Sequence, residues 1–361
     1  MKIFVFGSSI TSSYWNGAAT YYRGIYKHLA ALGHDITFAE PDVYGRQQRR
    51  DPDDYSYVNS LVYSTPQDLP WVLEQAQHAD LVVKHSGVGA DDELLEREVA
   101  LTLKEGIFRA FWDVDAPATL TRVEANPGDP FRRLIPEYDL IFTYGGGSPV
   151  VEHYLRLGAS CCHPIYNGLD PETHYPVAPD PDLGCDLVLV ANRLPDREKR
   201  VEDFFLRAAG LAPELKFVLG GEGWGGKRLP ANVRWIGHVA TGDHNRVNCS
   251  ARMVLNLNRE SMANVGFSPP TRVFEAAGTA SCLITDAWAG IETFFTPGKE
   301  ILVASAAEEV VELLRNTSPE RAQEIGAAMR RRALSDHTYA QRAAKVHEVL
   351  AAVRSHTGAA A

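Results

Sequence analysis

Three polar residues, Thr271, Arg272 and Glu275, lie on one face of a short helix that we predict within residues 266–286, GFSPPTRVFEAAGTASCLITD. Their spacing of three and four residues makes them neighbours on that helix. Two interpretations stay open. One is a solvent-facing ion pair between Arg272 and Glu275, which this stretch alone favours. The other is a ligand site, where Arg272 holds an anion in its planar fork and Glu275 accepts hydrogen bonds from hydroxyl groups.

The residues at both ends of this helix suggest its boundaries. Ser268 suits the N-cap, and Pro269 suits the first helical position because proline has no N–H to leave unpaired. Gly278 suits the residue just past the C-terminus. Free N–H groups at a helix start attract anions such as phosphate, so Ser268 is also a candidate binding residue.

Short apolar segments alternate with helical patterns along the whole chain, which is typical of α/β proteins with parallel sheets. We expect a first domain at residues 1–175, a second at 183–335 and a final helical segment at 336–361. A Pro-, Gly- and Asp-rich stretch provides the linker between the two domains. The predicted strands are 2–8, 34–42, 79–86, 108–115 and 138–147 in the first half, and 185–193, 216–223, 232–239, 252–259, 281–286 and 300–305 in the second.

Ligands of open α/β sheets bind beyond the carboxyl ends of the strands, and polar residues gather there in both halves of this chain. Two facing sheets of this kind can line one cleft. In the first half, Asp113 follows a strand and is the first candidate for a catalytic base; His85 is the second, with a structural loop histidine as its alternative. Asp113 and Asp115 could together bind Mg²⁺, but we prefer Asp115 as a turn-capping residue and predict no metal.

The second half offers a larger set of polar and glycine residues after its strands. Arg193 and Arg197 belong to a basic cluster that is either a solvated charge run or a phosphate-facing loop. The segment 220–226, GGEGWGG, would let the backbone approach a ligand, and its Trp224 either stacks on a base or sugar or packs against the neighbouring domain. The candidate ligand-binding residues are Asn192, Arg193, Arg197, Gly221, Glu222, Trp224, Arg259, Ser268, Arg272 and Glu275.

Composition limits the possible functions of the chain. Its 361 residues are 45% hydrophobic and carry a net charge of −10, which argues against binding a nucleic-acid polymer. No segment approaches the roughly 20 apolar residues of a membrane span, and the N-terminus does not resemble a signal peptide. The five cysteines show no metal-binding spacing. We therefore expect a cytoplasmic protein with reduced thiols and no transmembrane segment.

Several stretches resemble the CgeB-like glycosyltransferases of the GT-B architecture: FWDVDAPATL, YDLIFTYGGG, ANRLPDREKRVEDFF, DHTYAQRA and, most specifically, the segment around Glu275. The resemblance implies two facing Rossmann-like domains and a C-terminal helix that crosses back to the first. It implies a hexosyltransferase-like enzyme that moves a sugar from a nucleotide-diphosphate sugar, UDP-linked, to an unidentified acceptor, which is a glycan, a small molecule or a protein. No cofactor or metal is implied.

The same resemblance assigns roles to individual residues. The donor would lie on the second domain in the interdomain cleft, and the acceptor mainly on the first. Glu275 looks like the second of two glutamates that many retaining relatives carry seven residues apart, where it holds the ribose of the donor. The first of the two falls at Phe267, so the chain departs from that pattern and the stereochemistry stays open. Arg272 and Arg259 would face the diphosphate.

Two other functions fit the sequence. A nucleotide-sugar epimerase can share this fold and would use the donor site without an acceptor. A non-enzymatic two-domain sugar-binding protein would close on its ligand, but such proteins are usually exported and need no arginine beside a glutamate at a helix start. A dinucleotide dehydrogenase is disfavoured because the GxGxxG fingerprint is missing.

Overall fold

The protein consists of two compact α/β units. A computed structural model describes residues 1–358, with side chains described up to residue 353. The first unit contains residues 1–167 and the segment from Tyr339 onward, and the second contains residues 168–338.

The first unit is built on a seven-stranded parallel sheet of order β3-β2-β1-β4-β5-β6-β7. The central strands are buried on both faces, as all-parallel sheets require. In this register Val5 of β1 lies beside Phe38 of β2 and Val83 of β4. The strands are β1 (Lys2–Phe6), β2 (Asp35–Pro41), β3 (Asn59–Tyr63), β4 (Leu81–His85), β5 (Phe108–Asp113), β6 (Leu140–Thr143) and β7 (Cys162–Pro164).

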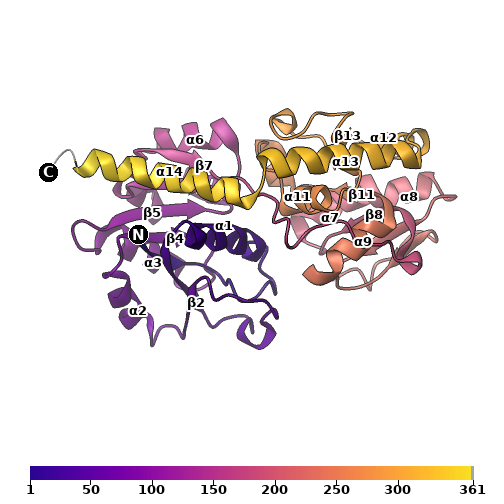
Figure 1. The fold of residues 1–361 in the computed structure, drawn as a ribbon. Coiled ribbons are helices and arrows are strands. Elements are labelled where there is room, and N and C mark those ends of the chain that lie inside the picture. The colour runs from indigo at the N-terminus through magenta and orange to yellow at the C-terminus, as the bar shows by residue number, and fades with distance from the viewer. Residues whose placement is uncertain (359–361) are drawn as a thin grey trace. The chain divides into compact units, whose positions relative to one another are not determined.

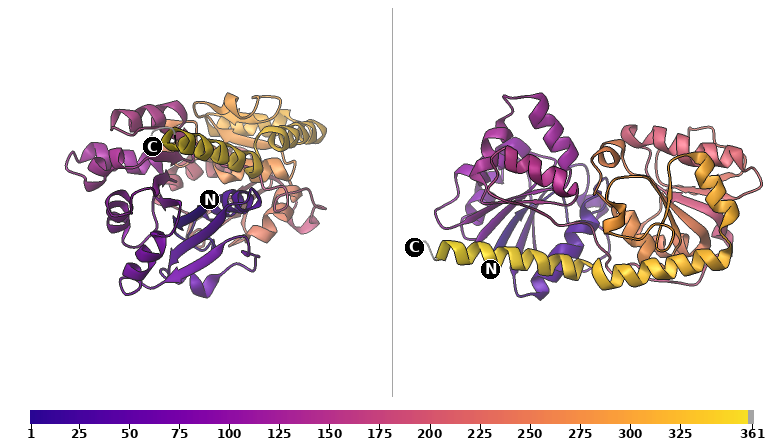
Figure 2. Two further views of the ribbon diagram at one scale, coloured as in Figure 1. Left: turned by 60° about the vertical axis from the view of Figure 1, so that its left-hand side comes forward. Right: turned by 90° about the horizontal axis from the view of Figure 1, so that it is seen from above.

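Seven α-helices belong to the described part of the first unit, and the last of them comes from the far end of the chain. They are α1 (Ala19–Ala31), α2 (Leu69–Ala76), α3 (Asp92–Leu101), α4 (Ala116–Ala125), α5 (Pro130–Leu134), α6 (Gly147–Arg156) and α14 (Tyr339–Gly358). Helix α14 packs along α1 (Figures 1 and 2). The contact depends on Gly24, because a Cβ atom there would lie 2.3 Å from the ring of Tyr339. The sequence predicted this return of the final helix.

The second unit has a six-stranded parallel sheet of order β10-β9-β8-β11-β12-β13. Its strands are β8 (Cys185–Val190), β9 (Phe217–Gly220), β10 (Val233–Trp235), β11 (Ala251–Asn256), β12 (Leu283–Asp286) and β13 (Leu302–Ala304). Its helices are α7 (Pro195–Val201), α8 (Arg207–Leu211), α9 (His244–Ser250), α10 (Glu260–Val265), α11 (Thr271–Gly278), α12 (Ala307–Asn316) and α13 (Pro319–Asp336), with a π-helical turn, η4 (Glu202–Leu206), between α7 and α8. One apolar core fills the space between this sheet and its helices.

Residues 168–184, which include the predicted linker, belong to the second unit. The N–H of Val177 lies 3.4 Å from Cys249 Sγ, and the N–H of Asp180 donates to Ser250 Oγ at 2.8 Å. Residues 168–175, which the sequence analysis placed in the first domain, lie in the second unit because their backbone packs on α11 and α13. For example, the N–H of Leu169 donates to the carbonyl of His337 at 2.7 Å.

Two further observations bear on the composition. All five cysteines are free thiols. Among the described residues, the helices are either too short or too polar to cross a bilayer.

Candidate functional site

Helix α11 begins two residues later than the sequence suggested. It runs from Thr271 to Gly278, and Pro270 occupies the N-cap position. A residue that precedes proline is disfavoured in the helical region, so Pro269 is kept out of the helix by Pro270. Ser268 is not the cap: its buried hydroxyl donates to the carbonyl of Gly266 at 2.9 Å. Pro270 makes no side-chain capping hydrogen bond, so in the part of the chain that the structure describes the positive end of α11 lacks an N-cap side chain.

Gly278 is the last residue of α11 and does not lie beyond its end. A Cβ atom at this position would lie 2.6 Å from the carbonyl oxygen of His174. The glycine therefore allows residues 168–175 to pack closely on the helix, which is a different requirement from the left-handed cap that the sequence suggested.

Glu275 is a buried carboxylate with unfilled hydrogen-bonding capacity. Its side chain is about one-tenth exposed or less, and Oε2 lies 3.1 Å from Arg272 Nη1 and 3.4 Å from His244 Nδ1. In the described structure no donor makes a well-aligned hydrogen bond to Oε2. Burial by itself would raise the pKa of Glu275, but the charges of Arg272 and His244 hold it well below its usual value. The group is therefore an ionised acceptor in a sheltered position.

Two histidines from distant parts of the chain complete this site. The rings of His174 and His244 stack with their centroids 6.1 Å apart, and buried His174 has no hydrogen-bond partner at Nε2. Burial lowers the pKa of His174, although the Glu275 carboxylate opposes this shift. The sequence analysis missed both residues, because His174 lies in an irregular segment about a hundred positions before Glu275 and no local pattern connects them.

His174, His244 and Glu275 also form a possible metal-ligand set within the described residues, with ligand atoms all within 4.8 Å of one another. A zinc site with two histidines and one carboxylate has the same donor types. Here, however, the guanidinium of Arg272 lies against the same carboxylate oxygen that would face the metal. A fixed positive charge at this distance opposes a divalent cation and favours a neutral or anionic ligand.

A second group of predicted residues lies at the carboxyl ends of β8 and β9. The N–H of Glu222 donates to Asn192 Oδ1 at 3.0 Å, and the N–H of Arg193 donates to the carbonyl of Glu222 at 2.9 Å. Gly221 has φ 114°, and a Cβ atom there would lie 2.2 Å from the carbonyl oxygen of Ala191. The structure thus brings these predicted residues together and explains the glycine by close backbone packing.

The arginines near this loop are paired with carboxylates. Arg193 contacts Glu198 at 2.8 Å and Arg259 contacts Asp196 at 2.6 Å. Arg197 lies on α7, the helix that also carries Asp196 and Glu198. A bound diphosphate would have to compete with these carboxylates for the arginines, whose positions are already fixed by the pairing.

Trp224 is fully buried and does not present a face for stacking. Its Nε1–H donates to the carbonyl of Ala191 at 2.8 Å within the core of the second unit. The indole at the glycine loop is that of Trp235, which donates to the carbonyl of Gly221 at 2.9 Å and lies against Gly225. Neither alternative predicted for Trp224 is observed, because its indole packs within the core of its own unit.

In the first unit, Asp113 is fully buried at the end of β5 and its oxygens are occupied. Oδ1 accepts from Ser86 Oγ at 2.8 Å, from Thr119 Oγ1 at 3.1 Å and from the N–H of Asp115 at 2.9 Å. Oδ2 accepts from the Tyr154 hydroxyl at 2.6 Å. Burial raises the pKa of Asp113, and these hydrogen bonds oppose the rise. The carboxylate thereby ties β4, β5, α4 and α6 together.

His85 is also fully buried, at the end of β4. Its Nε2 lies 2.6 Å from the Tyr26 hydroxyl, and its ring packs between the rings of Tyr22 and Trp112. Burial, with a contribution from Lys84, lowers the pKa of His85 to about 3. The imidazole is therefore neutral at physiological pH and lies in an aromatic environment. Both Asp113 and His85 are fully buried, so neither predicted base is accessible to solvent in the described structure.

Known proteins are similar to this chain in part of its sequence and in its fold. Residues 197–348 match the family model described as glycosyl transferase-like. No curated protein matches the chain. Solved structures resemble it over nearly its whole length, at low sequence identity. HepE of Anabaena in complex with UDP-glucose has a TM-score of 0.67 at 12% identity and covers 98% of this chain and 100% of its own.

Two other solved structures are similar to the chain. Sucrose-phosphate synthase of Thermosynechococcus elongatus has a TM-score of 0.68 at 15% identity, covering 99% of this chain and 100% of its own. An α-glucosyltransferase in complex with UDP and DNA has a TM-score of 0.61 at 10% identity, covering 94% and 95%. The expected GT-B fold is therefore confirmed, and residues 197–348 match the glycosyl transferase-like family model within it.

Proposed function

We propose that this GT-B glycosyltransferase transfers a sugar from a UDP-linked donor, bound on the second unit at α11, to an acceptor bound on the first. One observation carries the proposal: Glu275 is a buried, ionised carboxylate with no well-aligned donor to Oε2 in the described structure. Arg272 and His244 lie close to this oxygen, but neither makes a well-aligned hydrogen bond to it, and a ligand hydroxyl would supply one. The vicinal hydroxyls of a ribose supply two O–H donors at the spacing of one carboxylate.

The surroundings of Glu275 suit the rest of a nucleotide diphosphate. The uncapped N-terminus of α11 lies one turn away and offers N–H groups and a partial positive charge. Arg272 adds a full positive charge. A diphosphate leaving group gathers negative charge as the glycosidic bond breaks, and groups that are already in place stabilise it without reorganisation.

We propose that the reaction needs no metal ion. The arginine beside Glu275 would take the place that a divalent cation has in other nucleotide sites, and its charge disfavours a cation at the His174, His244 and Glu275 set. Arg259 would release Asp196 and bind a phosphate oxygen of the nucleotide-sugar. We also propose that the protein is a CgeB-like enzyme and that it acts in the cytoplasm.

The epimerase and the sugar-binding protein give different products, so one incubation separates the three functions. UDP-glucose, UDP-galactose and UDP-N-acetylglucosamine are incubated with the protein and EDTA, and the nucleotides are separated by ion-exchange chromatography. A glycosyltransferase without its acceptor hydrolyses its donor slowly, so we expect UDP from one donor. The Glu275→Gln variant should lose this release, and Glu292→Gln, an exposed glutamate of the same unit, should keep it. Formation of the epimeric UDP-sugar without UDP, or no change to any donor by folded protein, would contradict the proposal.

A further inference from the structure

Trp15 and Tyr44 are large aromatic residues that are exposed and held in left-handed backbone conformations. Trp15 is 59% exposed with φ 48°, and Tyr44 is 63% exposed with φ 57°. Bulky side chains are disfavoured at positive φ, and strained residues of this kind concentrate at functional sites. Burial in the core does not offset the strain, because more than half of each residue is exposed. A ligand that covers the rings explains both features.

Both residues lie on loops at the carboxyl ends of adjacent parallel strands. Trp15 is in the loop after β1, and Tyr44 is in the loop after β2. This edge of a parallel sheet is where α/β proteins bind ligands. Trp71, which is 51% exposed, lies on helix α2 and has no positive φ, so exposure of an indole alone does not mark this site.

Arg46 holds the two aromatic residues in place. Its Nη2 donates to the carbonyl of Trp15 at 3.3 Å and its Nη1 to the carbonyl of Ser8 at 3.0 Å. The guanidinium carbon lies 5.1 Å from the centroid of the Tyr44 ring, and the Tyr44 hydroxyl donates to the carbonyl of Gly89 at 3.0 Å. The two loops and their rings are therefore fixed relative to each other.

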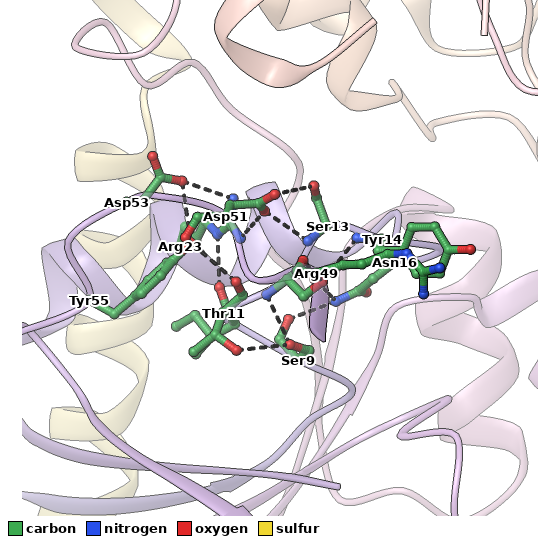
Figure 3. A network of polar contacts seen from close by, with 12 residues as sticks. Ser9, Thr11, Ser13, Tyr14, Asn16, Arg23, Arg49, Asp51, Asp53 and Tyr55 are labelled. Carbon is green, nitrogen blue, oxygen red and sulfur yellow. Dashed lines mark hydrogen bonds and ion pairs between the residues drawn. The ribbon is translucent and has the colours of Figure 1, made fainter. Parts of the chain in front are cut away.

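Further hydrogen bonds tie the loop after β1 to the loop after β2 (Figure 3). Ser12 Oγ donates to the carbonyl of Arg49 at 2.6 Å, and Ser13 donates from both its N–H and its hydroxyl to Asp51. Asp51 is also paired with Arg23 at 2.6 Å. A surface that is ordered before binding loses little conformational freedom when its ligand arrives.

The loop after β2 also carries arginines whose charge is not paired locally, because Asp51 and Asp53 of the same loop pair with Arg23. In the described part of the chain, no carboxylate lies within ion-pair distance of Arg46, Arg49 or Arg50, although the net charge of the whole chain is −10. Glu40, the nearby acid, instead accepts from the N–H of Ile10, from Thr11 and from Gln47. Arg49 and Arg50 are exposed, and the guanidinium of Arg49 lies 4.1 Å from the Tyr14 ring (Figure 3).

We propose that Trp15 and Tyr44, together with Arg49 and Arg50, form the acceptor-binding surface of the first unit and that the acceptor is a negatively charged saccharide. The C–H face of a sugar ring packs against an aromatic face, and guanidinium groups bind carboxylate or phosphate in a fork. Arg46 acts through Trp15 and Tyr44 as a positioning residue. The identity of the ligand as an acceptor rests on the proposed glycosyltransferase function.

Three matched oligosaccharides test the class of ligand. They are tetragalacturonate, maltotetraose with one terminal phosphate, and neutral maltotetraose, each titrated calorimetrically into the full chain at low salt. We expect at least one anionic probe to bind about tenfold or more tightly than the neutral one, because a charge-assisted hydrogen bond supplies at least that ratio. The carboxylate and phosphate probes show which anion is preferred. Equal binding of all three, or tighter binding of an oligothymidylate than of any saccharide, would overturn the proposal.

Variants then locate the surface. Trp15→Gly and Tyr44→Gly remove the rings at positions where glycine adopts the backbone freely, so both variants should fold. We expect each to weaken the anionic probe about tenfold or more, and Arg50→Gln to reduce the preference for charge. The controls Trp71→Ala and Arg133→Gln are exposed residues elsewhere in the same unit and should bind within about twofold of wild type. Equal effects in variants and controls would overturn the assignment.

UDP titrated into the same samples separates this inference from the proposed function. Retained UDP binding with no saccharide binding contradicts the acceptor surface alone. Saccharide binding at Trp15 and Tyr44 with no UDP binding contradicts the transferase function and the acceptor role, while leaving the saccharide surface in place.

Discussion

The contact between Glu275 and a ribose can be isolated by changing one polar group on each partner. The ligand change is UDP to 2′-deoxy-UDP, and the protein change is Glu275→Gln, which keeps the shape of the side chain and removes its charge. A hydrogen bond to a charged group contributes about 1.5–3 kcal/mol. Because Arg272 and His244 already share the charge of Oε2, we expect a value near 2 kcal/mol, or about a thirtyfold ratio of dissociation constants.

The assay is isothermal titration of both nucleotides into wild type and variant, arranged as a double-mutant cycle. Wild type should bind UDP about thirtyfold more tightly than 2′-deoxy-UDP, and most of this preference should disappear in Glu275→Gln. Thermal melting comes first, since the substitution leaves Arg272 buried without its carboxylate and lowers stability. The exposed Glu292→Gln serves as the control that keeps the preference. If the preference survives unchanged in a folded Glu275→Gln protein, the carboxylate does not contact the ribose.

Four further predictions concern both units. Asp113→Asn should lower the free energy of unfolding by about 1–3 kcal/mol, because an amide has one accepting oxygen and cannot accept all four hydrogen bonds that the carboxylate accepts, including the one from the Tyr154 hydroxyl. Loss of sugar transfer with an unchanged melting temperature would instead support Asp113 as a catalytic base. Since burial lowers the pKa of His85 to about 3, the unfolded chain takes up a proton below about pH 6.5 while the folded chain does not. The free energy of unfolding should therefore decrease by about 1.4 kcal/mol for each unit by which the pH is lowered from about 6.5 to about 3. His85→Gln should flatten the slope of the denaturant midpoint against pH. Trp15→Gly should melt no lower than wild type, because it relieves a left-handed conformation; a clear loss would mean that the indole packs. Donor turnover should be unchanged by EDTA, and a loss that added Mg²⁺ or Zn²⁺ restores would contradict the metal-free reaction.

The sheet strands were predictable because they are short apolar runs that end in polar or glycine residues. The runs LVV at Leu81–Val83 and LVLV at Leu187–Val190 carry that signal within buried strands. Strands β3 and β7 were missed: Asn59–Tyr63 is a partly exposed strand at the sheet edge, and Cys162–Pro164 has only three residues. Their pairing is decided by neighbouring strands and not by local pattern.

The site was predictable in part, and its limits have physical causes. Local spacing placed Arg272 beside Glu275, and the observed ion pair confirms that contact. Local spacing could not find His174, because the contact is made by an irregular segment that packs on α11 through Gly278. Local spacing also could not show which indole is buried. Trp224 lies within the segment GGEGWGG and Trp235 contacts it, and only the packed core distinguishes the two.

The positions of Trp15 and Tyr44 show the same limit in the first unit. The sequence indicated polar residues after the strands of the first half, but the strained conformation and the unpaired arginines appear only once two loops meet at the sheet edge. Asp113 was correctly placed at a strand end, yet the four donors that occupy it come from other elements of the unit. Contacts over such distances follow from the fold and not from spacing.

The central claim is that the second unit binds a UDP-linked sugar at α11. The most direct test is calorimetric titration of UDP-sugars, with ADP- and GDP-sugars for comparison, into the purified chain in the presence of EDTA. The account predicts that a UDP-sugar binds the wild type, and that Glu275→Ala and Arg272→Ala lose this binding while remaining folded. Absence of binding by every nucleotide sugar, from a protein with a cooperative melting transition, would contradict it.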